Sequence, residues 1–400
     1  MRVTQTLNQT QFLAAISALE SNLSKTQNQI SSNQAFTTAS QNPTAAGAVN
    51  NYSQALAQSQ QYVTNSGSAQ TRLSIEDSTL SQVQAQLQSL RDLALEANNS
   101  TLSSQDRAAI ASQATQIQAS LVTLANAQDG NGEYLFGGFS SQTQPFTLSA
   151  AGATYNGDQG QRQVQIAAGQ TIADGDNGNA VFNQIKTGNG IFVAAPASAN
   201  TGTGVLGAAT VSAAAGTYDG GTYAINFTAP GTYEVRDSAN ALVASGSYTD
   251  GSTISFRGVQ IALTGQPAVG DSFNVAPSAN QSVFTTVQNL VTALQTGASA
   301  NTSAGTARLN NSMAAAINDI DQALGQMSNL RAGVGARLNS ITTQQSVAGS
   351  QQVQLQTSIS SLQSLDYASA ITTLDQQNMT LSAALQAYTI TQGLSLFKYL

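Results

Sequence analysis

The sequence predicts an α+β protein, with helices towards both ends of the chain and an antiparallel β domain inserted between them. Two periodicities indicate this fold class. Towards both ends, apolar residues recur every three or four positions, which is typical of helices in a left-handed coiled coil. Between about residues 140 and 280 the period changes to two, which is typical of strands with one buried face. The chain of 400 residues is long enough for two or three domains.

The first helical stripe lies near the N-terminus and steps alternately by four and three residues. Its members are Phe12, Ile16, Leu19, Leu23, Thr26 and Ile30. The flanking positions carry Gln, Ser, Asn and Thr, where a solvated coiled coil would carry Glu and Lys. We therefore expect the outer faces of this helix to contact protein. The alternative is ordinary core packing within a helical domain.

Three further stripes follow the same rule. They comprise Leu73, Glu76, Leu80, Val83, Leu87, Leu90, Ala94 and Ala97; then Ile110, Ala114, Ile117, Leu121 and Leu124; and finally Leu309, Met313, Ala316, Ile320, Ala323, Met327, Leu330, Val334, Arg337 and Ile341. Ser103 and Asp106, between the first two of these stripes, have the spacing of a capping box, which predicts a helix start. The alternation of four and three predicts left-handed coiled-coil packing.

The middle of the chain alternates apolar and small polar residues. The apolar members are Tyr223, Ile225 and Phe227; Val259, Ile261 and Leu263; and Phe273 with Val275. Pro230-Gly231, Asn156-Gly157 and Asp250-Gly251 are typical turn sequences between such runs. We therefore predict an antiparallel β insertion whose two ends, near 140 and 281, lie close together. The tract 194–217, rich in Ala, Gly, Ser and Thr, is predicted to be a flexible loop within it.

The composition is unusual for a soluble protein, because only 8% of the residues are charged, against about 25% in ordinary proteins. Such a surface can be buried against other subunits without desolvating charge. The net charge is -7 and the thirteen basic residues are scattered, which argues against a nucleic-acid partner. No run approaches the roughly 20 apolar residues of a membrane span. Residues 1–11 lack an apolar stretch of about 7 to 15 residues, so we expect no ordinary secretory signal.

The residue types exclude most catalytic sites. Without His or Cys there is no Ser-His-Asp triad, HExxH zinc site or thiolate nucleophile. The SxxK motif at 395–398 and the KTG motif at 186–188 stand in the wrong order for a serine β-lactamase. The GxGxxG match at 202–207 opens no amphipathic helix. Calcium-like segments at 174–178 and 129–132 are better interpreted as turns, because the first lacks the bidentate Glu.

No cofactor, metal site or catalytic residue is therefore predicted, and we expect that the protein is not an enzyme. Two alternatives from other classes stay open. A carboxylate-based hydrolase is compatible with the twenty acidic residues. A surface adhesin would also be polar and free of Cys, but it should carry a signal peptide and a membrane anchor, neither of which is visible.

Several segments, in order, resemble hook-associated protein 3 of the bacterial flagellum and, more loosely, flagellin. They are AAGAV (45–49) after Asn42-Pro43, LSIEDSTLSQV (73–83), LANAQDGNGEYLFGGF (124–139), LRAGVGARLNSI (330–341), LDYASAITTLDQQ (365–377) and SLFKYL (395–400). The resemblance covers about 1–140 and 281–400. The segment GVQIALTGQPAVGDSFNV (258–275) is similar to the β domain of hook-associated proteins, but it is less diagnostic.

This resemblance implies that the chain folds back so that its two ends pair in a long antiparallel coiled-coil rod. Stripes near both termini also lack partners unless they contact each other. We expect a terminal coiled-coil domain from 1–44 and 350–400, disordered in the monomer; a helical rod domain from 45–140 and 281–349; and a β domain at 141–280. The resemblance also implies unfolded export through the flagellar type III apparatus, which the absence of Cys would suit, and an extracellular location without a cleaved signal peptide.

The function implied is that of a structural subunit that joins hook to filament and templates flagellin assembly; the alternative is a flagellin filament subunit. The implied partners are other copies in a ring, hook-associated protein 1 on the hook side, flagellin on the filament side, and a flagellar export chaperone. Four large apolar side chains crowd the last seven residues, so we predict an assembly or chaperone site there rather than packing on the chain's own rod. The predicted interface comprises Phe12, Ile16, Leu19, Leu23, Ile30, Leu381, Leu385, Leu394, Leu396, Phe397 and Leu400.

Overall fold

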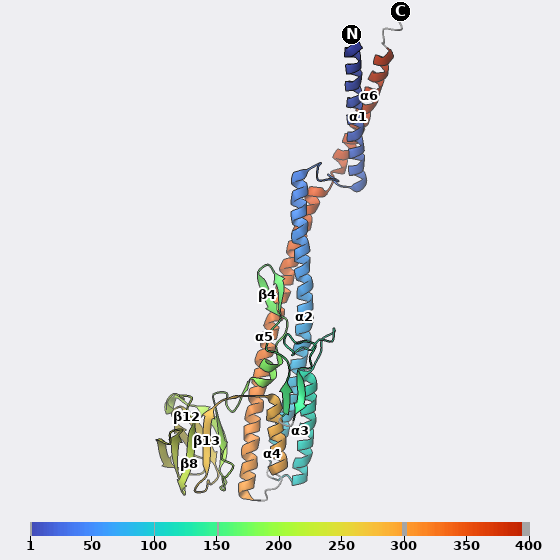
Figure 1. Ribbon diagram of the computed structural model, residues 1–400. Coiled ribbons are helices and arrows are strands. Elements are labelled where there is room, and N and C mark those ends of the chain that lie inside the picture. The colour runs from blue at the N-terminus through green and yellow to red at the C-terminus, as the bar shows by residue number, and fades with distance from the viewer. Residues whose placement is uncertain (1, 100, 150–151, 298–301, 394–400) are drawn as a thin grey trace, which may run out of the picture. The chain divides into compact units, whose positions relative to one another are not determined.

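The computed structural model describes residues 2–99, 101–149, 152–297 and 302–393 (Figure 1). Its helices are α1 (Arg2–Ser32), α2 (Pro43–Ala97), α3 (Ser104–Ala125), α4 (Val283–Gly297), α5 (Ser303–Gln363) and α6 (Tyr367–Gly393), and the strands lie between α3 and α4. The predicted α+β class, with helices from both chain ends around an inserted β region, is confirmed.

The chain divides into two compact units. The terminal unit comprises 1–64 and 343–400, and the central unit comprises 65–342. The long helices α2 and α5 contribute to both units.

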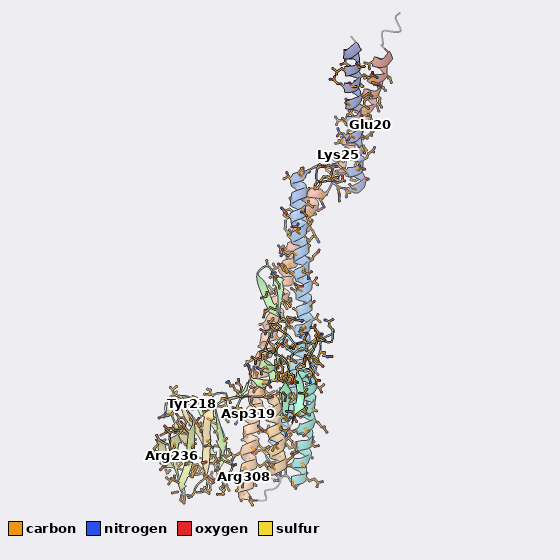
Figure 2. All side chains as sticks on the ribbon, viewed as in Figure 1. Glu20, Lys25, Tyr218, Arg236, Arg308 and Asp319 are labelled. Carbon is orange, nitrogen blue, oxygen red and sulfur yellow. The ribbon has the colours of Figure 1, made fainter. Side chains whose placement is uncertain are left out.

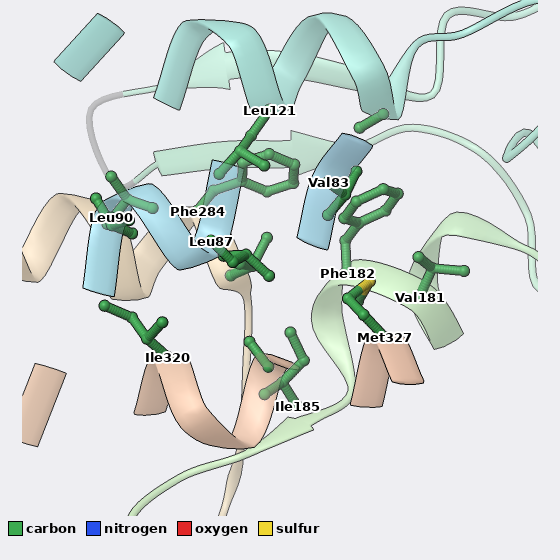
Figure 3. Packing of buried hydrophobic residues seen from close by; sticks show 14 of the residues in the cluster. Val83, Leu87, Leu90, Leu121, Val181, Phe182, Ile185, Phe284, Ile320 and Met327 are labelled. Carbon is green, nitrogen blue, oxygen red and sulfur yellow. The ribbon is translucent and has the colours of Figure 1, made fainter. Parts of the chain in front are cut away.

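The three stripes predicted to be helical lie on α2, α3 and α5 and face a common core (Figure 3). Leu80, Leu87 and Leu90 of α2 and Ile320 and Met327 of α5 are completely buried. Each such side chain contributes about 1.5–3 kcal/mol through burial. The start of α3 is also as predicted, because the Asp106 N–H donates to Ser103 Oγ at 3.2 Å and the Ser103 N–H donates to Asp106 Oδ2 at 3.0 Å.

The strands nearest the helices belong to this helical core. They are β1 (Phe146–Ser149), β2 (Gly152–Tyr155), β3 (Gln163–Ala167), β4 (Gln170–Ala173) and β5 (Ile185–Lys186), with a short π-helix at Asn179–Asn183. The ring of Phe182 lies 5.3 Å from that of Phe146 and 5.7 Å from that of Phe284 on α4, between ring centroids. Aromatic contacts at these distances add to the stabilisation from burial. Residues 146–185 therefore help to hold α2, α4 and α5 together.

One acidic residue of the predicted α2 stripe, Glu76, is almost fully buried. Burial and the neighbouring Asp176 carboxylate raise the pKa of the Glu76 carboxyl well above its usual range. The Asp176 N–H donates to Glu76 Oε1 at 3.2 Å, and the Asp176 carboxylate forms an ion pair with Arg337 of α5. This cluster ties α2 and α5 to the segment after β4.

A turn was predicted for each of the two calcium-like segments, and the structure confirms one of these turns but not the other. The predicted turn at 129–132 is confirmed, since the Gly132 N–H donates to the Asp129 carbonyl at 3.1 Å and Gly132 has a positive φ of 81°. The β-turn predicted at 174–178 is wrong, because this segment is irregular and leads into the π-helix. The two carboxylates of residues 174–178 form ion pairs with arginines elsewhere in the chain. Asp174 pairs with Arg162 at 2.6 Å, and Asp176 pairs with Arg337.

The β domain, residues 192–277, has a separate hydrophobic core. Its strands are β6 (Phe192–Pro196), β7 (Val205–Val211), β8 (Tyr223–Ala229), β9 (Thr232–Asp237), β10 (Leu242–Ser247), β11 (Thr253–Phe256), β12 (Val259–Thr264) and β13 (Ser272–Pro277). They form a five-stranded sheet in the order β10-β9-β8-β13-β6 and a three-stranded sheet in the order β11-β12-β7. The predicted alternating residues of β8, β12 and β13 are all buried in this core.

The flexible loop predicted at 194–217 is wrong. Residues 194–217 contain the end of β6 and all of β7, and β7 pairs with β12 in antiparallel register. Leu206 is buried in the β-domain core and Ala209 packs against it. Small residues obscured this strand in the sequence, because they lack the bulky β-branched signature of most strands.

The β domain is attached through two adjacent backbone segments. The Thr187 N–H donates to the Ala279 carbonyl and the Ser278 N–H donates to the Ile191 carbonyl, both at 3.0 Å. Beyond them, β14 (Asn280–Gln281) pairs with β5. The chain therefore enters and leaves the β domain side by side near 187–191 and 278–281, whereas the sequence had placed the first boundary near 140.

Candidate assembly surface

In the terminal unit, α1 and α6 pack side by side in antiparallel directions (Figure 1). The ring of Phe12 stacks on that of Tyr388 with centroids 5.6 Å apart, and towards the other end the Tyr367 hydroxyl donates to the Ile30 carbonyl at 3.4 Å. Facing residues therefore have numbers that add to about 400. On α6 the side facing α1 repeats the four-three step of the α1 stripe, through Ala370, Leu374, Gln377, Leu381, Ala384 and Tyr388.

The predicted interface residues fall into three groups. Ile16 is buried, and Phe12, Leu19, Leu23, Ile30 and Leu381 are half-buried, at positions that face the other helix of this pair. Leu385 is 44% exposed. Leu394, Leu396, Phe397 and Leu400 lie outside the described residues. Most of the predicted α1 stripe thus faces α6 of the same chain, and Leu385 remains accessible.

The contact between α1 and α6 is thin. Within 6–32 of α1 and 367–391 of α6, only Ile16, Thr26 and Ala370 are buried. Gln377 lies in the middle of the contact, and its Oε1 atom is buried without a hydrogen-bond partner. An unsatisfied buried acceptor costs about 1–3 kcal/mol. This pair of helices is therefore weakly stabilised.

An apolar flank runs along the outside of the pair. Leu13, Ile371 and Leu385 each follow a stripe residue by one position and are all 44% exposed. In an antiparallel pair, these flanking positions lie on the same side of the contact, and the numbers of Leu13 and Leu385 add to 398, close to the facing sum. We call Leu13, Ile371 and Leu385 the apolar flank. Sequence reasoning named Leu385 alone, although the position next to the stripe could have identified the other two.

Exposed apolar residues are concentrated in the terminal unit. It holds ten of the seventeen large apolar side chains that are exposed among the described residues, in less than a third of the chain. An apolar surface of this kind is typical of an interaction site. The apolar flank is thus a candidate surface for contact with further helices.

The terminal unit carries very little charge. By sequence it holds six charged residues, which are Arg2, Glu20, Lys25, Asp366, Asp375 and Lys398. Figure 2 labels Glu20 and Lys25 on α1. By contrast, every ion pair formed among the described residues joins positions between 72 and 337 in the central unit. The terminal helices can therefore be buried against protein at little cost in charge desolvation.

Neither a metal centre nor a membrane span emerges from the described residues. No three carboxylates within 2–99, 101–149, 152–297 and 302–393 gather as a metal site would require. No helix in those ranges combines the length and hydropathy needed to cross a bilayer.

Comparison with known proteins relates both chain ends to flagellar proteins. Residues 3–141 match the bacterial flagellin N-terminal helical region, and residues 317–400 match the bacterial flagellin C-terminal helical region. Flagellar hook-associated protein 3 of Salmonella typhimurium is 33% identical over 185 residues, which is 46% of this chain and 58% of that protein. The protein of the same name from Escherichia coli is 34% identical over 39% of this chain and 49% of its own length. The matched segment thus spans about half the length of these two relatives.

Two crystal structures are similar over most of the chain. FlgL of Xanthomonas campestris is 40% identical, with a TM-score of 0.73, and the match covers 77% of this chain and 99% of that one. The flagellar hook-associated protein-3 of Legionella pneumophila is 28% identical, with a TM-score of 0.74, and the match covers 78% and 98% of the two chains.

Proposed function

Since the chain belongs to the flagellar hook-associated protein 3 family, we propose that it is a structural, non-enzymatic subunit that joins the hook to the filament of a bacterial flagellum and templates flagellin assembly. The observation that carries this proposal is the apolar, nearly uncharged flank on the paired terminal helices. A monomer gains no stability from exposing such residues, whereas a helical assembly would bury them.

Other copies of this chain, arranged in a ring, would cover the apolar flank. Burying a Leu side chain contributes about 1.5–3 kcal/mol, and each subunit would bury Leu13, Ile371 and Leu385. The half-buried stripe residues between α1 and α6 would then act indirectly, by holding the two helices in the register that aligns Leu13 with Leu385. Assembly would also order the terminal helices, which the thin contact stabilises only weakly.

The other proposed partners follow from a position between the hook and the filament. Hook-associated protein 1 would contact the subunit on the hook side and flagellin on the filament side. The protein would reach this extracellular site through the type III export apparatus, with an export chaperone. Leu394, Leu396, Phe397 and Leu400 are proposed as a chaperone or assembly site on the basis of sequence alone.

Immunogold labelling of isolated flagella tests the function. In wild-type cells, label should mark a short zone between hook and filament. With Leu385→Glu, the purified monomer should keep its melting temperature, because the side chain is accessible, but the labelled zone should be lost and flagellin should be shed into the medium. A charge buried in the assembled contact without a partner is strongly unfavourable.

Val269→Glu provides a matched control. Val269 is an exposed aliphatic residue of the β domain, 57% accessible, and the same substitution there should leave the labelled zone in place. Label along the whole filament would instead identify the chain as a flagellin. Normal filaments with Leu385→Glu would show that the apolar flank is not the assembly contact.

A further inference from the structure

The β domain has little apolar attachment to the rest of the central unit. Its core and the helical core are separate clusters of buried residues. Where β6 and β7 approach α5 there is a cavity of about 50 Å³. Small side chains, including Ala314 and Ala315 of α5 and Gly207 and Ala209 of β7, form part of its lining. A cavity of this size can hold water, so apolar packing does not fix the domain at this interface.

Two polar side chains of α5 make the attachment instead. The Leu206 N–H of β7 donates to Asn311 Oδ1 at 2.8 Å, and Asn311 Nδ2 donates to the Gly204 carbonyl at 2.9 Å. Asn311 is only 5% exposed, so these bonds are shielded from water. Its amide thus pairs with the start of β7 as a neighbouring strand would, through one donor and one acceptor.

The second contact lies eight residues along the same helix. Asp319 accepts the Gly188 N–H at 2.8 Å through Oδ1 and Gln281 Nε2 at 3.1 Å through Oδ2. Both donors belong to the segments through which the chain enters and leaves the β domain. Asp319 therefore fixes the point of attachment, whereas Asn311 fixes a second point within the domain, about 12 Å away along the helix at 1.5 Å per residue.

A rigid domain that is held only at its entry and exit segments can rotate about them, and a second contact away from those segments opposes this rotation. The attaching segment can accommodate rotation, because Gly188 and Gly190 both have positive φ, at 64° and 86°. We propose that Asn311 is a latch that holds the β domain in one orientation on α5, and that loss of its two hydrogen bonds lets the domain swing about residues 187–191 and 278–281. This inference does not depend on the proposed junction role.

Spin-label distance measurements on the full chain test the latch. The sequence contains no Cys, so Ser328→Cys on α5 and Ser245→Cys on β10, both exposed, give specific labels on the helix and on the domain. The distance distribution should be narrow in the otherwise unchanged protein. It should become broad and shifted with Asn311→Ala, while circular dichroism stays the same. Asn311→Asp should also broaden it, because a carboxylate cannot donate to the Gly204 carbonyl.

The adjacent Asn310, half-buried on the same helix, provides the matched control. Asn310→Ala should keep the narrow distribution. An equally narrow distribution with Asn311→Ala would overturn the proposal.

Amide hydrogen exchange in the unsubstituted protein gives an independent test that requires no variant to fold. If the latch opens without unfolding the domain, the Leu206 N–H should exchange on the order of tenfold faster than an amide inside the five-stranded sheet, such as that of Phe227, which donates to the Asp271 carbonyl at 2.9 Å. Equal protection of the two amides would overturn the proposal as well.

Discussion

Deleting residues 145–278 should abolish cooperative folding of the central unit. That segment supplies Phe146, Ile166, Val181, Phe182 and Ile185 to the helical core, all at most 2% exposed. At about 1.5–3 kcal/mol for each buried side chain, their loss is comparable to the whole net stability of a domain, about 5–15 kcal/mol. Thermal unfolding followed by circular dichroism should therefore show no cooperative transition.

The matched deletion removes only 190–277 and joins the ends with a short Gly-Ser linker. Residues 187–189 and 278–281 lie side by side through the hydrogen bond from the Thr187 N–H to the Ala279 carbonyl, so a few residues suffice to close the gap. This variant should unfold cooperatively and should still be exported and support filament growth. Failure of the 190–277 variant to fold would mean that the β domain stabilises the helices. A folded 145–278 variant would contradict the role assigned to the buried side chains of residues 146–185.

In the purified monomer, α1 and α6 should be digested by proteinase K while the central unit resists. Ordering the 31 and 27 residues of these helices costs about 1–2 kcal/mol per residue in backbone entropy. The contact between them buries only three residues, and it also leaves one buried amide oxygen without a hydrogen-bond partner. Burial therefore does not offset this cost. Intact-mass analysis should show loss of material up to about residue 40 and from about residue 355, without a change in the main melting transition.

A reversible crosslink gives the control for this experiment. Leu19→Cys with Leu381→Cys places two thiols at facing positions of the pair in a chain that is otherwise free of Cys. The oxidised form should resist digestion at both ends, and the reduced form should behave as the unsubstituted protein does. Protection of both helices in a verified monomer without the crosslink would contradict the prediction.

The helices were predictable because their stripes are long and strictly periodic. Leu80, Leu87, Ile320 and Met327 occupy the buried positions that a spacing of three and four demands, and the buried Glu76 obeys the same period. The paired ends followed from the same logic, since the α1 stripe needed a partner and the facing side of α6 repeats its spacing. The alternating strands β8, β12 and β13 were predictable for the equivalent reason, at period two.

Other parts could not be predicted because their outcome is decided by tertiary contacts. Phe146 and Phe182 lie in a segment that reads as strand and turn, and nothing local indicates that they pack with Phe284 of α4 rather than with the β domain. β7 has Gly207, Ala208 and Ala209 at its centre, and these small residues give it the composition of a loop. The apolar flank was mostly missed because a single Leu beside a stripe carries no periodic signal of its own.

The scarcity of charge in the terminal unit also bears on the surroundings in which an assembled flagellum works. Attraction between exposed charges is screened over about 10 Å at 0.1 M salt and over about 3 Å at 1 M, so contacts built on surface ion pairs weaken as salinity rises. Burial of the apolar flank does not depend on attraction between charges, so it is not weakened by screening. Salts that are excluded from the protein surface strengthen apolar burial. A joint held by Leu13, Ile371 and Leu385 would keep its strength from fresh water to brine.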